Sequence, residues 1–342
     1  MRKTFMVVMS LGACLAALRI PLAGQQAPQQ QPQTAQFQTP PMPALPNDGL
    51  GETDQALIPG QPWKIRDLNR PKPVAVTPAR HLGDPPSDAV VLFDGKDLTQ
   101  WTVGAGRGNP QAAAGAAGPA PTQTAPAIAS WKVQDGYVEV TPGSGSLTSK
   151  ERFKDFQLHV EFATPVIPMG TSQYRGNSGI TIGGREIQVL DNYNNATYAD
   201  GYVAAIYTQW PPLANPSLPP GQWQTLDVAY MAPRYDGERI TRNAFITIIV
   251  NGVMVQNNRE IQPAVRGAGP GGPGRGAGNA PAGAVPARGP AIVPGSDQPI
   301  GLMGHPSAIP GNAVRYRNIW ARKVQVDLPT STAESVPAQP AR

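Results

Sequence analysis

Apolar and polar residues alternate along much of the chain from residue 89 onward, with the period of two that is typical of β-strands. Residues that favour turns separate these stretches. No amphipathic stretch is long enough to predict a helix of more than two turns. We predict strands at 89–93, 131–134, 136–141, 156–163, 178–183, 185–190, 203–208, 223–231, 244–250, 253–256, 299–303 and 314–325. Many short strands joined by turns predict an all-β fold, an antiparallel β-sandwich or jelly roll.

One hairpin has a particularly clear signature. Asn251 and Gly252 separate the apolar runs 248–250 and 253–255, and both residues tolerate the positive φ that a type I′ turn requires. The strand before the turn is apolar on both faces, which predicts a central, buried position.

The segment that offers the clearest candidate functional side chains is residues 184–193, Gly-Arg-Glu-Ile-Gln-Val-Leu-Asp-Asn-Tyr. Ile187 and Val189 point to one side of the predicted strand, and Glu186 and Gln188 point to the other. A carboxylate beside an amide on an open sheet face suits a polyol ligand, because together they accept from and donate to hydroxyl groups. The alternative is an ordinary strand with one solvated face.

Composition divides the chain into parts. Its 40 Pro and 37 Gly residues concentrate in tracts that cannot bury enough apolar surface to form a core. What remains is about the size of one large sandwich. We predict a signal peptide at 1–24, a disordered Gln/Pro linker at 25–47, an irregular arm packed on the sandwich at 48–86, the sandwich at 87–326 with low-complexity insertions at 104–129 and 264–296, and a disordered tail at 327–342.

The N-terminus predicts export. A basic start precedes an apolar stretch, residues 5–18, that is too short to cross a bilayer. We therefore expect a secreted or periplasmic protein with no integral membrane segment after cleavage. Leu-Gly-Ala-Cys at 11–14 also fits a bacterial lipobox, so a lipid anchor at Cys14 is the alternative. Cys14 is the only cysteine, which excludes an internal disulfide from the mature protein.

The charge pattern argues against a nucleic-acid partner. The formal net charge is +5 with 15% charged residues, and the chain has no dense Lys/Arg block.

A series of short motifs appears in a characteristic order. They are Leu92-Phe93-Asp94-Gly95-Lys96-Asp97-Leu98 with Trp101, Trp131-Lys132-Val133-Gln134-Asp135-Gly136, Phe156-Gln157-Leu158-His159-Val160-Glu161-Phe162, Gly176-Asn177-Ser178-Gly179-Ile180, Asn251-Gly252-Val253, Gly301-Leu302 and Val314-Arg315-Tyr316-Arg317-Asn318-Ile319. This series resembles the 3-keto-disaccharide hydrolase domain family over roughly residues 87–325 without the two insertions. The resemblance implies a concanavalin-like, laminarinase-type β-sandwich that acts on a sugar.

The same resemblance implies chemistry on a 3-keto sugar. A ketone at C3 acidifies the C2 proton, a base removes that proton, the glycosidic oxygen leaves from C1, and water adds to the double bond. We take Glu186 as the candidate base and Gln188 as an anchor for a sugar hydroxyl. The alternative is that Glu186 only binds sugar or forms a salt bridge with Arg185 or Arg175.

Two other motifs of the resemblance contribute candidates. His305 follows a predicted strand where the family often has a His or a similar polar group, and the ordinary pKa of histidine suits proton transfer. Arg175 and Asn177 precede a strand in an Asn-Ser-Gly motif, and Asn177 can hydrogen-bond a sugar. Structural roles are the alternative for His305 and Asn177. His159 alternates with polar neighbours, so we expect it on the solvated surface.

Residues 191–195 form an oxygen-rich loop. We assign Asp191 and Tyr193 to substrate binding and expect no cofactor. Ca²⁺ is the alternative, although the spacing matches no EF-hand loop. Four aromatic residues could stack on sugar rings, and we expect one or two of them to line the site: Tyr193, Tyr198, Tyr207 and Trp210.

Laminarinase-type glucanases carry an E-x-D-x-x-E strand that invites comparison with residues 186–191. Here the middle position is Gln188, and Asp191 at the end faces away from Glu186 by strand parity. A retaining glycosidase needs two carboxylates about 5–5.5 Å apart. The pattern therefore argues against a retaining glycosidase, and the family resemblance implies hydrolysis of 3-keto-glycosides by elimination and hydration. The alternative is a non-catalytic carbohydrate-binding sandwich module.

Overall fold

The structure, a computed structural model, describes residues 55–104, 131–141, 144–262, 294–305 and 311–324. All of these belong to one unit, residues 39–342. The elements are β1 (Val90–Phe93), β2 (Trp101–Gly104), β3 (Lys132–Gln134), β4 (Tyr137–Glu139), β5 (Ser146–Phe153), β6 (Phe156–Ala163), η1 (Ser172–Tyr174), β7 (Ser178–Ile182), β8 (Arg185–Val189), η2 (Ala199–Gly201), β9 (Trp223–Met231), β10 (Arg234–Asp236), β11 (Arg239–Arg242), β12 (Ala244–Val250), β13 (Val253–Ile261), β14 (Gln298–Leu302) and β15 (Arg315–Lys323).

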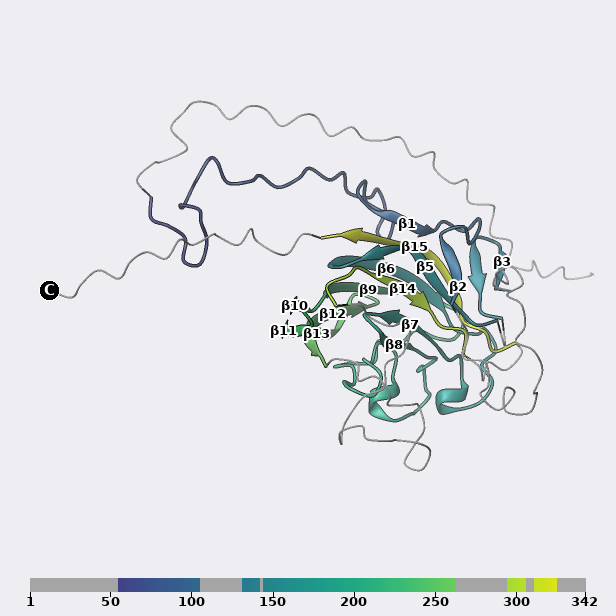
Figure 1. Cartoon of the computed structure of the whole chain (residues 1–342). Helices are drawn as coiled ribbons and strands as arrows, with labels where there is room; N and C mark the ends of the chain where they lie inside the picture. The colour runs from purple at the N-terminus through teal and green to yellow at the C-terminus, as the bar shows by residue number, and fades with distance from the viewer. Residues whose placement is uncertain (1–54, 105–130, 142–143, 263–293, 306–310, 325–342) are drawn as a thin grey trace, which may run out of the picture. The chain divides into compact units, whose positions relative to one another are not determined.

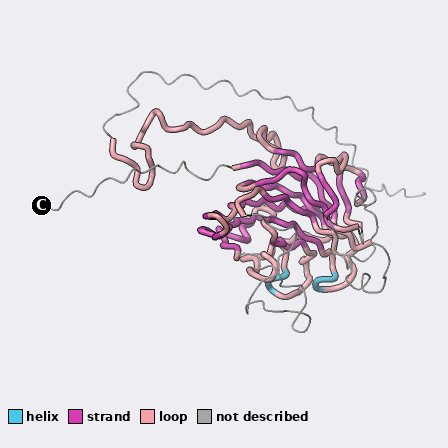
Figure 2. The backbone as a smooth tube through the Cα atoms, in the orientation of Figure 1, coloured by secondary structure: helices cyan, strands magenta, loops and turns pink. Residues whose placement is uncertain are grey.

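Two antiparallel sheets form the sandwich (Figure 1). The larger sheet has the order β13-β12-β9-β6-β15-β4-β3, and β1 pairs with β15 beside this path. The smaller sheet has the order β2-β5-β14-β7-β8, and β10 and β11 form a separate hairpin. Figure 2 shows that the strands gather in the sandwich and that the two short helices lie between loop segments. The predicted all-β sandwich is confirmed.

The core lies between the two sheets. Tyr316 of β15 is fully buried, and its ring stacks on Trp131 with centroids 6.2 Å apart. Its hydroxyl donates a 2.7 Å hydrogen bond to Oγ of Ser178 on β7, so this side chain joins one sheet to the other. Burial of apolar surface is the main force that holds such layers together.

The hairpin between β12 and β13 confirms its sequence signature. Asn251 and Gly252 have φ values of 50° and 78°, as a type I′ turn requires, and Val250 pairs with Val253. The expectation that β12 is central is only partly correct, because β12 lies one strand from the sheet edge. Alternate residues are buried, whereas Phe245 and Ile249 on the other face are partly exposed.

The structure differs from the predicted strands in two ways. Prediction missed β2, β5, β10 and β11; in β5 the polar and charged residues outnumber the apolar Leu147 and Phe153. The predicted strand at 203–208 is wrong. Only Ile206 forms β-bridges, because Ala204 and Thr208 have φ values of 63° and 64° that turn the chain out of a regular ladder.

The arm before the sandwich contributes one clear contact. No residue of 55–86 is buried, and the only pairing within this segment is a bridge between Leu57 and Lys64. Near its end, the carbonyl of Gly83 accepts 2.7 Å hydrogen bonds from Asn318 Nδ2 and Trp320 Nε1.

This contact corrects the expectation for His159, which is only 2% exposed. A Cβ at position 83 would lie 3.2 Å from its Nε2, and its ring stacks on Trp320. Nδ1 of His159 lies 2.6 Å from Oδ1 of Asp227. His159 is therefore covered by Trp320 and the arm and does not face solvent.

Several predicted parts lie outside the described residues: the signal peptide with Cys14, the Gln/Pro linker, the tail and most of both insertions. Of the insertions, the structure describes Gly104 at the end of β2 and residues 294–296. Within the described ranges, no helix is long and apolar enough to cross a membrane.

Candidate functional site

The candidate site lies on β7 and β8. Their register places Thr181 opposite Glu186 and Gly179 opposite Gln188. Opposite residues share a face of a sheet. Ile187 of β8 belongs to the core cluster between the sheets, so Glu186 and Gln188 point to the other face, as the alternation predicts.

That face is not open, contrary to our expectation. Glu186 is 3% exposed and Gln188 is 0% exposed. Nε2 of Gln188 donates to Oδ1 of Asn177 at 2.9 Å, and the backbone N–H of Tyr207 donates to the carbonyl of Glu186 at 3.0 Å. The segment before β7 therefore contacts the polar face, and the segment after β8 pairs along the edge of β8, which local periodicity does not reveal.

Glycine provides the space beside Glu186. A Cβ at position 179 would lie 3.0 Å from both Cγ of Glu186 and Sδ of Met303. Met303 follows β14, and its N–H donates a 2.8 Å hydrogen bond to the carbonyl of Gly179. His305 is two residues further along this segment and is partly buried. The end of β14 thus lies next to the candidate base.

Amide side chains organise the neighbouring loop. Nδ2 of Asn177 donates to the carbonyl of Gln173 at 2.8 Å, and Nε2 of Gln188 also reaches Oε1 of Gln173 at 3.3 Å. Oε1 of Gln188 is buried and accepts no hydrogen bond from the described residues. Sequence reasoning missed Gln173, because a single glutamine in the three-residue helix η1 has no periodic signal.

Three predicted substrate-binding residues bind one another. Nε of Arg175 donates to Oδ2 of Asp191 at 2.8 Å, and the carboxylate is only 1% exposed. Its Oδ1 accepts from the N–H of Tyr193 at 3.2 Å, and Nη2 of Arg175 donates to the carbonyl of Tyr193 at 3.0 Å. This arrangement stabilises the loop, and both oxygens of Asp191 are engaged within it.

The oxygen-rich loop uses its other polar groups in the same way. Nδ2 of Asn195 donates to the carbonyl of Asp191 at 2.6 Å, and Oδ1 of Asn192 accepts from the N–H of Val203 at 2.8 Å. Across the described ranges, no group of three or more His, Cys, Asp or Glu residues could hold a metal ion. Whether a cofactor binds stays untested, and the alternative of Ca²⁺ would require these internal bonds to be replaced.

Two of the aromatic candidates lie beside Glu186. Tyr207 is opposite Glu186, and its hydroxyl is 2.5 Å from the hydroxyl of Tyr198. Tyr198 is 46% exposed, and Tyr193 is 39% exposed. Trp210 is engaged elsewhere, since its Nε1 donates to the carbonyl of Glu260 at 3.0 Å.

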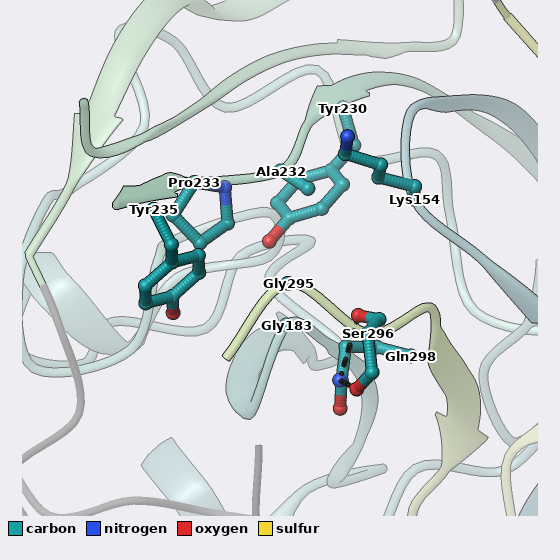
Figure 3. Close-up of a pocket in the computed structure, with 9 residues that line it drawn as sticks. All are labelled: Lys154, Gly183, Tyr230, Ala232, Pro233, Tyr235, Gly295, Ser296 and Gln298. Atoms are coloured by element: carbon teal, nitrogen blue, oxygen red, sulfur yellow. Dashed lines mark hydrogen bonds between the residues drawn. The ribbon is translucent and has the colours of Figure 1, made fainter. Parts of the chain in front are cut away.

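A small surface pocket occurs at a different place (Figure 3). The rings of Tyr230 and Tyr235 lie on one side of it, with Gly295 and Ser296 across from them. None of the seven candidate site residues lines this pocket, so we do not assign the proposed chemistry to it.

Comparisons place these observations in context. A model of the 3-keto-alpha-glucoside-1,2-lyase-like domain matches residues 88–322. A crystal structure of a proposed glycosyl hydrolase from Parabacteroides distasonis is 34% identical, with a TM-score of 0.57, covering 74% of this chain and 93% of that chain. A second such protein from the same organism is 15% identical, with a TM-score of 0.41, over 70% of this chain and 94% of that one. No curated protein matches the sequence.

Proposed function

Because the chain belongs to the 3-keto-alpha-glucoside-1,2-lyase-like domain family, we propose that it cleaves 3-keto-glycosides between C1 and the glycosidic oxygen. The family match and the 34% identical proposed glycosyl hydrolase support a carbohydrate-active enzyme. The observation that carries the proposal is the buried carboxylate of Glu186, which shares the polar face of β7 and β8 with Thr181 and Gln188.

The proposed reaction needs one base. Glu186 accepts the C2 proton that the C3 ketone acidifies. The electron pair of the C2–H bond forms a C1–C2 double bond, and the C1–O bond breaks. The leaving oxygen takes a proton and departs as an alcohol. Addition of water to the double bond then yields the free 3-keto sugar, so no oxidant or reductant is consumed.

The alternative of a two-carboxylate glycosidase has less support. Position 188 is an amide, and Asp191 is bound to Arg175 and to the N–H of Tyr193. Both oxygens of Asp191 are thus already engaged within the loop. The arrangement therefore favours elimination, which needs no second carboxylate.

Other candidates receive supporting roles in the proposal. Gln188 orients Asn177, whose side chain is partly buried and can bind a sugar hydroxyl. His305 is a second candidate for proton transfer, because its segment begins at Met303 beside Glu186. Arg175, Asp191 and Tyr193 shape the loop at the end of β8.

The test uses 3-keto-trehalose, 3-keto-maltose and their unoxidised parent sugars in D₂O. We expect cleavage of the 3-keto sugars only, with deuterium at C2 of the released 3-keto-glucose. The Glu186→Gln variant should lose turnover, while sugar binding stays within about tenfold, because the amide keeps the shape but cannot accept the proton. Glu238→Gln is the matched control, since Glu238 is exposed in the turn between β10 and β11.

Two results would count against the proposal. Cleavage of an unmodified glucan without exchange at C2 would restore the two-carboxylate mechanism. Full activity of Glu186→Gln would remove Glu186 from the mechanism, and the same assay on His305→Gln would then test His305 as the base.

A carbohydrate-binding role without catalysis is the second candidate, favoured by the exposed side chains of Tyr193 and Tyr198. It predicts equal binding of oxidised and unoxidised sugars with no turnover of either. We also propose export, based on the apolar N-terminus. Mass spectrometry of the mature N-terminus would distinguish cleavage near residue 24 from a lipidated Cys14.

A further inference from the structure

The polar face that carries Glu186 also holds a pair of tyrosine hydroxyls. Ile187 and Ile206 form an antiparallel bridge, and the N–H of Tyr207 donates to the carbonyl of Glu186 at 3.0 Å. The N–H of Gln188 likewise donates to the carbonyl of Ala205 at 3.0 Å. Tyr207 is thus directly opposite Glu186. Directly opposite residues point to the same face of a sheet, so the two side chains share that face.

Tyr198 is the more exposed member of this tyrosine pair. Its hydroxyl is 2.5 Å from that of Tyr207, and the two rings meet edge to face with centroids 6.2 Å apart. A Cβ at position 201 would lie 2.3 Å from Cε2 of Tyr198, so only glycine leaves room for the ring in this orientation. Because Tyr198 is 46% exposed, a ligand can contact this residue without unfolding of the loop.

We propose that Tyr198, oriented by Tyr207, donates the proton to the leaving glycosidic oxygen. This inference rests on the proposed function, in which Glu186 takes the C2 proton from the neighbouring carbon. Elimination needs a base and an acid at adjacent atoms of one sugar. Glu186 and Tyr207 share one face of the sheet, and the hydroxyl of Tyr198 is 2.5 Å from that of Tyr207.

The electrostatic setting suits this role. Burial comes first among the causes that raise the pKa of Tyr198, followed by the hydrogen bond with Tyr207 and the nearby charges of Asp200 and Glu186. The hydroxyl therefore stays protonated at neutral pH, as a proton donor must be. Once Tyr198 has lost its proton, the hydroxyl of Tyr207 turns its hydrogen toward the phenolate, since either oxygen of the pair can be the donor. The proton then returns from solvent, so the proton balance closes.

The experiment varies the leaving group. Methyl 3-keto-α-glucoside has a poor leaving group that needs an acid, whereas 4-nitrophenyl 3-keto-α-glucoside releases a stable anion that does not. We expect Tyr198→Phe to lower kcat on the methyl glycoside by about 100-fold or more. On the nitrophenyl glycoside, corrected for spontaneous cleavage, we expect a change of less than about threefold. The activity that remains there shows that the variant is folded.

Tyr207→Phe should also lower kcat on the methyl glycoside more than on the nitrophenyl glycoside. The decrease should be smaller than for Tyr198→Phe, because this variant removes only the partner of Tyr198. Tyr235→Phe on β10 is the matched control, and it should leave kcat unchanged on both glycosides. An equal loss on both substrates, or no loss on either, would overturn the role of Tyr198. The proposed function fails separately, if the wild-type protein cleaves neither glycoside and exchanges no deuterium into C2.

Discussion

Nε of Arg175 donates a 2.8 Å hydrogen bond to Oδ2 of Asp191, and this ion pair joins the segment before β7 to the segment after β8. The side chain of Asp191 is 1% exposed and that of Arg175 is 15% exposed. The backbone N–H of Asp191 also donates to the carbonyl of Arg175 at 3.3 Å. The pair therefore holds the two loop ends together at the edge of the candidate site.

We predict that Asp191→Asn lowers the free energy of unfolding by about 3 kcal/mol, near the lower end of what breaking a buried ion pair costs. The loss arises because the guanidinium of Arg175 keeps its charge without a counter-ion. Urea denaturation measures the change. Asp236→Asn is the control: its pair with Arg239 is 3.6 Å long with both side chains more than three-quarters exposed, so it should cost less than about 1 kcal/mol. Equal effects of the two variants would contradict a stabilising role for the Arg175–Asp191 pair.

The cluster around His159 predicts a pH dependence of stability. Burial alone would lower the pKa of His159, but the hydrogen bond with Asp227 and the nearby carboxylate of Glu161 raise it from 6.5 to about 9. Glu161 lies 3.8 Å from Nε2, a distance that fits an ion pair and is too long for a hydrogen bond. The folded state therefore favours protonated His159. Its contribution is fully present below pH 6.5 and is lost as the pH rises through about 9.

Glu161 acts at the other end of the pH range. Burial would raise its pKa, but His159, Asn318 and Arg317 together lower it from 4.5 to about 2. Its contribution is present above pH 4.5 and is lost as the pH falls through about 2. The cluster should therefore stabilise the fold most between pH 4.5 and 6.5.

Urea denaturation at pH values from 5.5 to 9.5 would test the histidine part. We predict that the wild-type protein loses more stability than His159→Gln as the pH rises from 6.5 to 9. His81→Gln, which changes an exposed histidine of the arm, should retain the wild-type slope. Parallel curves for the wild type and His159→Gln would show that this imidazole does not drive the pH dependence.

Gly179 provides a test of the space around the candidate base. We predict that Gly179→Ala lowers kcat on a 3-keto-glycoside by about tenfold to 100-fold, because a methyl group 3.0 Å from Cγ of Glu186 displaces the carboxylate. Overpacking should also cost about 1–3 kcal/mol of stability.

The double variant Gly179→Ala, Met303→Ala tests whether the losses come from contact of the added methyl group with Met303 or from a change in the backbone at position 179. Sδ of Met303 is the other atom 3.0 Å from the added methyl group, so its removal should recover part of both losses. If the double variant is as impaired as the single one, crowding by Met303 is not the cause.

The two low-complexity insertions give a prediction from composition. Replacing residues 105–130 or 263–293 by a short Gly/Ser linker should leave the melting temperature nearly unchanged, because such tracts bury little apolar surface to offset their ordering entropy. These limits retain Gly104 of β2 and the buried Trp131. Loss of a cooperative thermal transition in either deletion would contradict the prediction.

Local patterns in the sequence determined much of the fold. The strands at 156–163 and 223–231 have the predicted bounds, since alternation of side chains needs only the extended backbone itself. The turn at Asn251 and Gly252 follows equally from two residues that tolerate positive φ. The separation of Glu186 from Ile187 onto opposite faces of β8 was predictable for the same reason.

Tertiary structure alone decided which side chains are covered and what they bind. Gly83 of the arm covers His159, and Arg175 binds Asp191 instead of remaining available for substrate. Strand β5 is held between β2 and β14 although its own sequence has few apolar residues. Alternation tells which residues share a face, but the partner of that face comes from segments distant in the chain. Where these segments lie depends on the packing of the whole sandwich, which no local pattern encodes.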